Sequence, residues 1–323
     1  MPRLSALLVS MQRVSWQRAR ILLGCFAWSV TLLALPLGWA EALLLFAALV
    51  LLPLCLELLS RRESWRPERF ERVTVAIQFP GALALAGSFA LPPGIPAAVL
   101  ACPWLLFTIL MARRGASELI LGGRRSIGDI CVNAGLIYLA VGGSWTVISR
   151  AGWRPLEFRD IIVLATAVHF HYAGFILPLL AGWTASVLRD TSSRIAAIGV
   201  VIGVPAVAAG ITLSAFQITF VEWLAAWFLA GSSLLVAVQH LRLAARASGW
   251  LGRISFGISG TSLFLAMLLA AVYGLRAYWG IEWLDIPEML PFHGAVNAFG
   301  FALPGLLAWR IAPPTGARSG SLR

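Results

Sequence analysis

Residues 40–60 read AEALLLFAALVLLPLCLELLS, and the next two residues are Arg61 and Arg62. An apolar run of about twenty residues is long enough to cross the hydrocarbon core of a bilayer as an α-helix. Arginines directly after such a run are typical of a span that ends on the cytoplasmic side of a membrane. This stretch predicts a transmembrane helix, and runs of the same kind recur along the chain.

The composition of the whole chain agrees with a membrane protein. Hydrophobic residues make up 59% of the 323 residues and charged residues 12%, against roughly 45–50% and 25% in soluble domains. A chain with so little polar surface cannot cover a water-soluble globule, so lipid must cover it. A net charge of +11 would suggest nucleic acid as the partner of a soluble protein. In a membrane protein the same excess sets topology, so we expect the lipid bilayer and no nucleic acid as a partner.

Ten apolar runs are candidate transmembrane helices. They are residues 21–37, 40–60, 73–91, 94–112, 127–149, 161–188, 195–213, 218–240, 254–275 and 289–311. A short turn, Pro92-Pro93-Gly94, is all that separates the third run from the fourth. No internal repeat or long polar linker divides the chain. We therefore predict an all-α polytopic transmembrane helix bundle that forms a single domain over residues 1–323.

The arginines test this division independently, because all 25 basic residues are arginines. If the amino terminus is cytoplasmic, ten alternating spans leave four arginines outside and the other 21 inside. The outer four are Arg150, Arg154, Arg159 and Arg276. A missing or extra span would move the later arginines to the opposite side of the membrane and remove this asymmetry. We therefore predict about ten spans with both termini cytoplasmic.

Few ionisable residues lie at membrane depth, and such residues are functional candidates because placing them there is costly. They are His169 and His171 in the sixth run, Glu222 in the eighth and His293 in the tenth, with Asp129 and Asn133 near the inner end of the fifth. His240 and Glu57 lie at the ends of runs beside Arg242 and Arg61. We expect those two side chains to reach the membrane interface by snorkelling.

The two histidines of the sixth run are hard to attribute to packing alone. Residues two positions apart point about 200° apart on a regular helix, so His169 and His171 cannot both face one point. Either they serve different neighbours, or a local distortion near Gly174 and Pro178 brings them together. The sequence leaves both possibilities open.

Other polar residues share a helix face with a histidine. Tyr172 lies on the same face as His169, with Thr166 one turn earlier. His293 and Asn297 are four residues apart and also share a face. The runs that hold these residues have the same direction, so we expect both faces to lie in the outer half of the membrane.

Three segments of this region resemble a known family. They read Gly142-Gly143-x-Trp145, His169-Phe-His-Tyr172-Ala-Gly-Phe175 and His293-Gly-x-x-Asn297-Ala-x-Gly300-Phe301. Together they resemble the YndJ-like integral membrane family over about residues 127–310. The resemblance implies a polytopic protein of the bacterial cytoplasmic membrane, with core spans in residues 127–311 and variable amino-terminal spans in residues 1–126. It implies no particular activity.

These residues predict an intramembrane enzyme that performs acid/base isomerisation, cyclisation or epoxide opening on a lipophilic, isoprenoid or polyketide-like substrate. Histidine is readily tuned as an acid or a base, and a carboxylic acid in low-dielectric surroundings holds its proton. His169 or Glu222 would be the acid and His293 the base, with aromatic side chains such as Trp227 and Phe299 stabilising positive charge. The predicted catalytic residues are His169, His171, Tyr172, Glu222, His293 and Asn297, and the predicted substrate-binding residues are Trp145, Thr166, Phe170 and Trp223.

Three alternatives remain open. Buried histidine and glutamate can form the relay of a proton-coupled transporter, although no inverted repeat is visible. Three histidines with Glu222 could ligate zinc or iron in a membrane oxidoreductase, and His169 or His293 could ligate haem. Their spacing matches no HExxH pattern, so we predict no metal and no cofactor. In the third alternative the histidines only hold the helices of a non-catalytic scaffold together.

Overall fold

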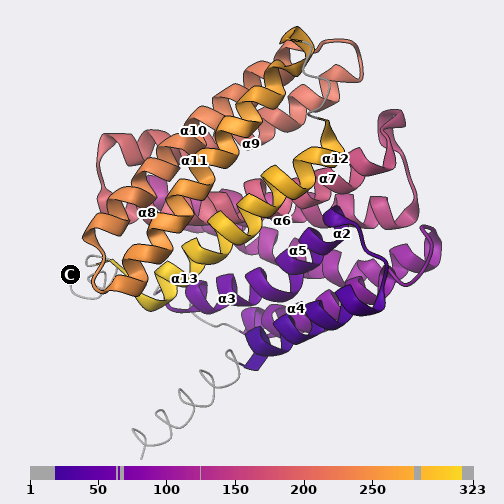
Figure 1. The fold of residues 1–323 in the computed structure, drawn as a ribbon. Helices are drawn as coiled ribbons and strands as arrows, with labels where there is room; N and C mark the ends of the chain where they lie inside the picture. Colours follow the sequence, from indigo (N-terminus) through magenta and orange to yellow (C-terminus); the bar gives the residue numbers. More distant parts are fainter. Residues whose placement is uncertain (1–18, 63–64, 66–68, 124, 280–284, 315–323) are drawn as a thin grey trace, which may run out of the picture.

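A computed structural model describes residues 19–62, 65, 69–123, 125–279 and 285–314, which are almost entirely helical and contain no strand (Figure 1). Eight helices are long and apolar enough to cross a membrane, and two shorter apolar helices, Ala19–Ala34 and Val73–Ser88, accompany them. All of them coincide with the ten predicted runs, which confirms the all-α polytopic bundle. The predicted cytoplasmic termini fall on residues 1–18 and 315–323, outside the described residues.

Three of the spans are built from several helical segments. The first joins α2 (Trp39–Phe46), η1 (Ala47–Leu51) and α3 (Leu52–Ser60). The second joins α7 (Asp160–His171), η3 (Tyr172–Ile176) and α8 (Leu177–Leu188). The third joins α12 (Ile286–Met289), η4 (Leu290–Gly294), η5 (Val296–Ala302) and α13 (Leu303–Ile311). The remaining long helices are α4 (Arg69–Ser88), α5 (Ile95–Leu121), α6 (Ile127–Ala151), α9 (Thr191–Ser214), α10 (Phe220–Arg246) and α11 (Trp250–Trp279).

Two helix ends have a local physical reason: the end of α5 differs from the predicted run, and the start of α6 agrees with it. α5 continues to Leu121, past the end predicted at residue 112, and an ion pair between Arg114 and Glu118 (2.8 Å) supports the extra turns. α6 begins at a capping box, in which the Ser126 hydroxyl accepts from the Asp129 backbone N–H (3.1 Å) and the Asp129 carboxylate accepts from Ser126 in return. Asp129 therefore has a structural explanation as a helix cap.

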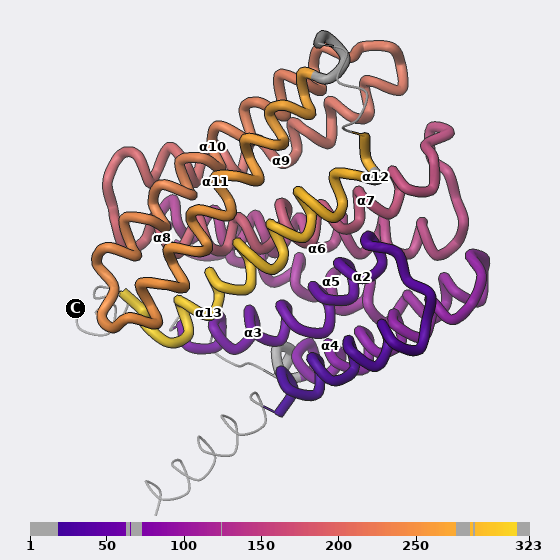
Figure 2. Tube along the Cα trace, viewed as in Figure 1, coloured from indigo at the N-terminus to yellow at the C-terminus, as the bar shows by residue number. Residues whose placement is uncertain are grey.

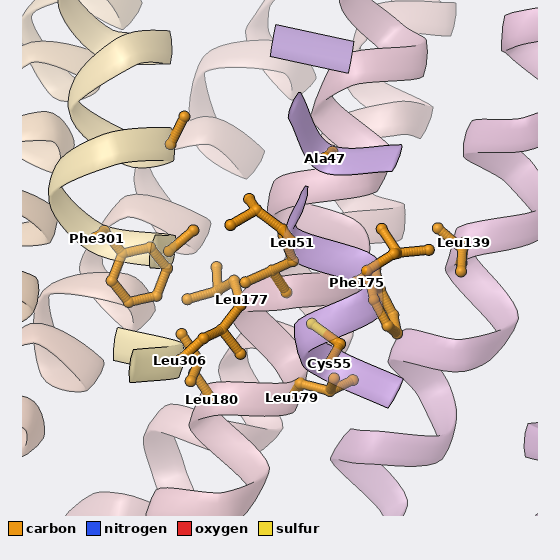
Figure 3. Close-up of a cluster of buried hydrophobic side chains, with 14 of the residues drawn as sticks. Ala47, Leu51, Cys55, Leu139, Phe175, Leu177, Leu179, Leu180, Phe301 and Leu306 are labelled. Atoms are coloured by element: carbon orange, nitrogen blue, oxygen red, sulfur yellow. The ribbon is translucent and has the colours of Figure 1, made fainter. Parts of the chain in front are cut away.

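The span from α2 to α3 lies at the centre of the bundle. Its most apolar window is 94% buried inside the protein, against 28% for residues 290–311. Figure 3 shows its residues Ala47, Leu51 and Cys55 between side chains of η3 and α8 on one side and of η5 and α13 on the other. This span can therefore position residues on both neighbours.

The other helices surround this central span. In Figure 2, α9, α10 and α11 run side by side, and α10 packs against both of the others along its length. On another side α4 packs against α5, and α5 packs against α6. Large apolar side chains remain exposed on the outer helices, among them Ile95, Val99, Ile202, Leu224 and Leu265. Such a surface belongs in lipid, in agreement with a membrane protein.

Arg150, one of the four arginines predicted to lie on the outer side of the membrane, holds the turn between α4 and α5. Gly94 in this turn has φ of 156°, a conformation that favours glycine. The Arg150 guanidinium donates hydrogen bonds to the carbonyls of Ser88 (2.9 Å) and Leu91 (2.7 Å). It also lies 4.5 Å from the centre of the Phe89 ring. Arg150 is 7% exposed, so it caps the carbonyls left at the end of α4.

The start of α9 offers a test of helix capping. The Asp190 carboxylate accepts from the Ser193 backbone N–H (2.8 Å) and pairs with Arg242. Arg242 and Ser193 hold the pKa of Asp190 well below its usual value. We expect Asp190→Ala to lower the free energy of unfolding by about 1 kcal/mol at neutral pH.

The pH dependence of this effect has a defined sign. A depressed folded-state pKa stabilises the fold above the unfolded pKa of about 4 and loses that contribution as the pH falls. Thermal unfolding in detergent, followed by circular dichroism, should therefore show the difference between wild type and variant narrowing below about pH 4. A difference that widens in acid would contradict this assignment.

Candidate functional site

Three spans that touch one another each depart from regular α-helical geometry. η1, η3, η4 and η5 are all π-helical. α2 packs against α7 and η4, and η3 packs against η5, so the distortions lie next to one another in space. π-helical segments are rare and occur frequently at functional sites, because they redirect side chains that a regular helix would place elsewhere. The contact between these spans is therefore the candidate site.

Prolines explain where the distortions occur. A proline inside a helix lacks the N–H donor and its ring clashes with the carbonyl four residues earlier, which must move aside. The prolines are Pro53, Pro178 and Pro304, and the residues four positions before them are Leu49, Gly174 and Gly300. These earlier residues fall within η1, η3 and η5 respectively. A local distortion is therefore present near Gly174 and Pro178.

One nitrogen in this region has no partner. Nε2 of His169 is buried and makes no hydrogen bond among the described residues. The His169 ring meets the Phe170 ring edge-on, with centroids 6.5 Å apart. α7, which carries His169, packs against α2, and α2 also packs against η4, which carries His293. A buried imidazole nitrogen without a partner is costly for stability, which makes it a candidate for binding or proton transfer.

The second histidine of the site is held in one orientation. Nδ1 of His293 donates to the carbonyl of Ala266 on α11 (2.9 Å), because a carbonyl can only accept. In the neutral ring Nε2 is then an acceptor, and the Asn297 amide lies 3.2 Å from it. The same amide donates to the His293 carbonyl (2.8 Å). The predicted pairing of His293 and Asn297 on one face is confirmed, and their bonds fix the tautomer.

Tyr172 links this region to the central span. Its hydroxyl donates to the Leu43 carbonyl on α2 (2.9 Å). An added Cβ at Gly294 would meet the Leu43 side chain at 2.8 Å, so η4 also approaches α2 closely. We define the histidine site as His169, Tyr172, His293 and Asn297.

His171 faces a different neighbour. Its Nδ1 donates to the Ala167 carbonyl (2.7 Å), and its Nε2 accepts from the Trp104 indole (3.1 Å). The Trp104 and His171 rings lie nearly parallel, with an interplanar angle of 16°. An added Cβ at Gly142 would meet the His171 ring at 2.8 Å. The two histidines therefore serve different neighbours: one nitrogen of His171 bonds its own helix and the other bonds Trp104 of α5, while its ring packs close to Gly142 of α6.

The remaining predicted site residues are placed as follows. Glu222 lies in the first turn of α10, where its backbone packs against Gly210 of α9, and no described hydrogen bond joins it to the histidine site. Trp223 follows it on the same helix. The Thr166 hydroxyl donates to the Ile162 carbonyl of its own helix (2.8 Å). Trp145 lies on α6 and the buried Phe170 on α7. Their roles in substrate binding stay predictions.

Sequence reasoning named Phe299 but missed the two aromatic residues that pack against it, Trp28 and Phe46. The rings of Trp28, Phe46 and Phe299 form a triangle with centroids 4.7 to 6.0 Å apart. The Trp28 indole donates to the Ala42 carbonyl (2.9 Å). Phe46 lies one turn after Leu43, whose carbonyl accepts from Tyr172, so the triangle packs on the same segment of α2 as the histidine site. Trp28 and Phe46 lie on spans that carry no motif.

A further histidine corrects an expectation. His240 was expected to snorkel to the interface, but it is 0% exposed. Its Nδ1 lies 2.9 Å from the Ser259 hydroxyl, which donates to the Phe301 carbonyl on η5 (2.9 Å). Nε2 of His240 is buried without a partner among the described residues. Glu57 was also expected to snorkel and is 5% exposed, because two arginines pair with it.

The ligand geometry bears on the metal and haem alternative. Within the described residues no group of three histidine, cysteine, aspartate or glutamate side chains is placed to hold a metal ion. His171 and His293 already use both ring nitrogens in protein contacts. Only His169 and His240 have a buried nitrogen left over.

Comparisons with known proteins give a family and a relative of similar sequence. The profile of a family described as YndJ-like protein matches residues 42–301. The uncharacterized membrane protein YndJ of Bacillus subtilis (strain 168) is 28% identical over 299 residues, which cover 89% of this chain and 51% of that protein. The chain thus spans about half the length of this relative. No solved structure matches. The profile match begins at residue 42, so it includes the central span and α4 and α5.

Proposed function

This chain belongs to the YndJ-like protein family, and we propose that it is an intramembrane enzyme that performs acid/base chemistry on a lipophilic substrate. The reaction class is isomerisation, cyclisation or epoxide opening of an isoprenoid or polyketide-like molecule, without a cofactor. We place it in the bacterial cytoplasmic membrane with its amino terminus inside, a proposal that rests on the asymmetry of the arginines.

One observation carries the proposal, the buried and unpartnered Nε2 of His169, on a helix that packs against α2 as the segment of His293 does. A histidine that only holds helices together has its nitrogens bonded, as His171 does. Nε2 of His169 is instead available to a substrate, and a ring nitrogen in that state can take up or release a proton. The surrounding protein excludes water, which strengthens each electrostatic interaction there.

The other residues support this role. Nε2 of His169 would remove a proton from one carbon of the substrate and return it to another, so an isomerisation leaves the enzyme unchanged. His293 donates to the Ala266 carbonyl and faces the Asn297 amide with its other nitrogen, so both of its nitrogens are engaged, and it would orient the site while His169 exchanges the proton. The triangle of Trp28, Phe46 and Phe299 offers π-faces that stabilise positive charge developing on the substrate.

Solvent deuterium provides the test. Membranes that contain the full chain are incubated in D2O with lipophilic extract from cells that produce the His169→Gln variant. We expect a precursor that accumulates in the variant to be converted to a product that carries deuterium, whereas variant membranes leave it unchanged. Conversion that proceeds equally in both membranes would contradict the assignment.

One observation favours proton-coupled transport as a second candidate. His293, Asn297 and Phe301 follow one another at four-residue intervals, and the Phe301 carbonyl leads through Ser259 to the buried His240. Titratable groups therefore occur at two depths of the bundle, as a proton relay requires. Proteoliposomes loaded with a pH-sensitive dye would distinguish the enzyme from the transporter. A transporter would change the pH of the lumen and leave the substrate chemically unchanged, whereas the enzyme would convert the substrate.

A further inference from the structure

A cavity lies at the end of the bundle that carries Arg61. Its volume is about 460 Å³, and it is lined by Ile21, Leu22, Arg61, Arg310 and Ile311. These residues come from the start of the helix Ala19–Ala34, the turn after α3 and the end of α13. Because apolar spans end here, the cavity lies at the level of the lipid headgroups.

The charges at this cavity do not balance. Glu57, which is 5% exposed, accepts hydrogen bonds from Arg61 and from Nε of Arg310 (3.1 and 3.2 Å). Arg61 also donates to the Arg310 carbonyl (3.2 Å). Two guanidinium groups therefore share one carboxylate, which leaves one positive charge in excess. The side chains of Arg61 and Arg310 are 46% and 26% exposed, so both remain accessible to a ligand.

The rest of the lining is apolar. Leu22 is 70% exposed and Ile311 is 48% exposed, and Ile21 lies between Leu22 and the arginine-rich end of its helix. A free inorganic ion would gain nothing from these side chains, whereas the acyl chain of a lipid would pack against them. The cavity thus combines a cationic end with an apolar wall.

We propose that this cavity binds an anionic phospholipid through its phosphodiester group. A phosphodiester carries one negative charge, which the excess positive charge at this cavity attracts, and guanidinium groups bind phosphate oxygens in bidentate geometry. The site is separate from the proposed acid/base site, because Arg310 follows His293 by 17 positions, about 25 Å along a helix. The lipid is therefore a bound partner of the fold, independent of the proposed function.

Lipid titration of the purified full chain tests this site. Native mass spectrometry would count bound dioleoylphosphatidylglycerol and dioleoylphosphatidylcholine, with inorganic phosphate as a competitor. We expect phosphatidylglycerol to bind preferentially and Arg310→Gln to weaken its binding about tenfold. The matched control is Arg246→Gln, an exposed arginine on α10 outside the cavity, which should leave binding unchanged.

Glu57→Gln gives the sharpest outcome, because its expected effect has the opposite sign. Removal of the carboxylate frees both arginines for the phosphate, so phosphatidylglycerol should bind more tightly than to wild type. Arg61→Gln, at the more exposed arginine, replaces Arg310→Gln if that variant does not fold. Equal binding by Arg310→Gln and Arg246→Gln, weaker binding by Glu57→Gln, or displacement of the lipid by inorganic phosphate alone would each overturn the proposal.

Discussion

Turnover by the His169→Gln variant is expected to fall about 10²–10⁴-fold, the usual contribution of a positioned acid or base. Glutamine keeps the polarity and approximate size of the side chain but cannot exchange a proton near neutral pH. Because Nε2 of His169 has no partner among the described residues, its replacement breaks no hydrogen bond of that atom, and thermal stability should change little. The rate is measured with the substrate identified by deuterium labelling, at matched amounts of folded protein.

His171 is the matched control, two residues away on the same helix. His171→Leu removes the acceptor of the Trp104 indole (3.1 Å) and leaves a buried donor unsatisfied. We expect a loss of about 1–3 kcal/mol in the free energy of unfolding, with turnover per folded molecule within a few-fold of wild type. If both variants lose turnover equally at equal stability, His169 has no special role and the catalytic assignment fails.

The positions of the spans could be predicted from the sequence because they depend on local properties. Apolar length and the asymmetric arginines mark each run without reference to its neighbours. Helix ends were less accurate where charged residues extend a helix, as the Arg114–Glu118 pair does beyond residue 112. The depth of burial was not predicted: the central span is the most apolar of the eight long spans, but apolar length alone does not distinguish a span covered by protein from one covered by lipid.

The candidate site was predictable only in part for the same reason. A four-residue spacing places His293 and Asn297 on one face of any helix, and their hydrogen bond follows. Which helix a face meets is a tertiary property, so the sequence could not show that His171 meets Trp104. It also could not show that His240 is buried, because a histidine beside an arginine at a span end is equally compatible with snorkelling.

The prolines carried a signal that was available in advance, but only a partial one. Each of the three multi-segment spans contains a proline whose clashing carbonyl lies in a π-helical segment. Prolines alone would not have singled out these spans, because Pro80, Pro103 and Pro205 lie inside α4, α5 and α9, which are α-helical throughout. The adjacency of the three multi-segment spans also depends on the packing of α2 against α7 and η4, which no spacing within one span encodes.

Gly182→Leu is expected to have the largest effect on stability. α6 and α8 approach so closely that a Cβ at Gly182 would lie 2.6 Å from the carbonyl oxygen of Gly128 and 2.9 Å from the Val132 side chain. Small residues allow this approach, on which helix association within lipid depends. Backbone atoms cannot move aside as a flexible side chain can, so the helices must separate. We expect a loss of about 3 kcal/mol or more in the free energy of unfolding.

Gly231→Leu is the control for this substitution. Gly231 lies inside α10, is exposed, and has no atom within 4 Å of an added Cβ. The same change there should alter stability by less than about 0.5 kcal/mol. Unfolding in increasing dodecyl sulfate, followed by circular dichroism, measures both variants. Because α8 continues directly from η3, separation of α6 and α8 should also displace the histidine site and reduce turnover. Equal stability of the two variants would show that this contact does not hold the bundle together.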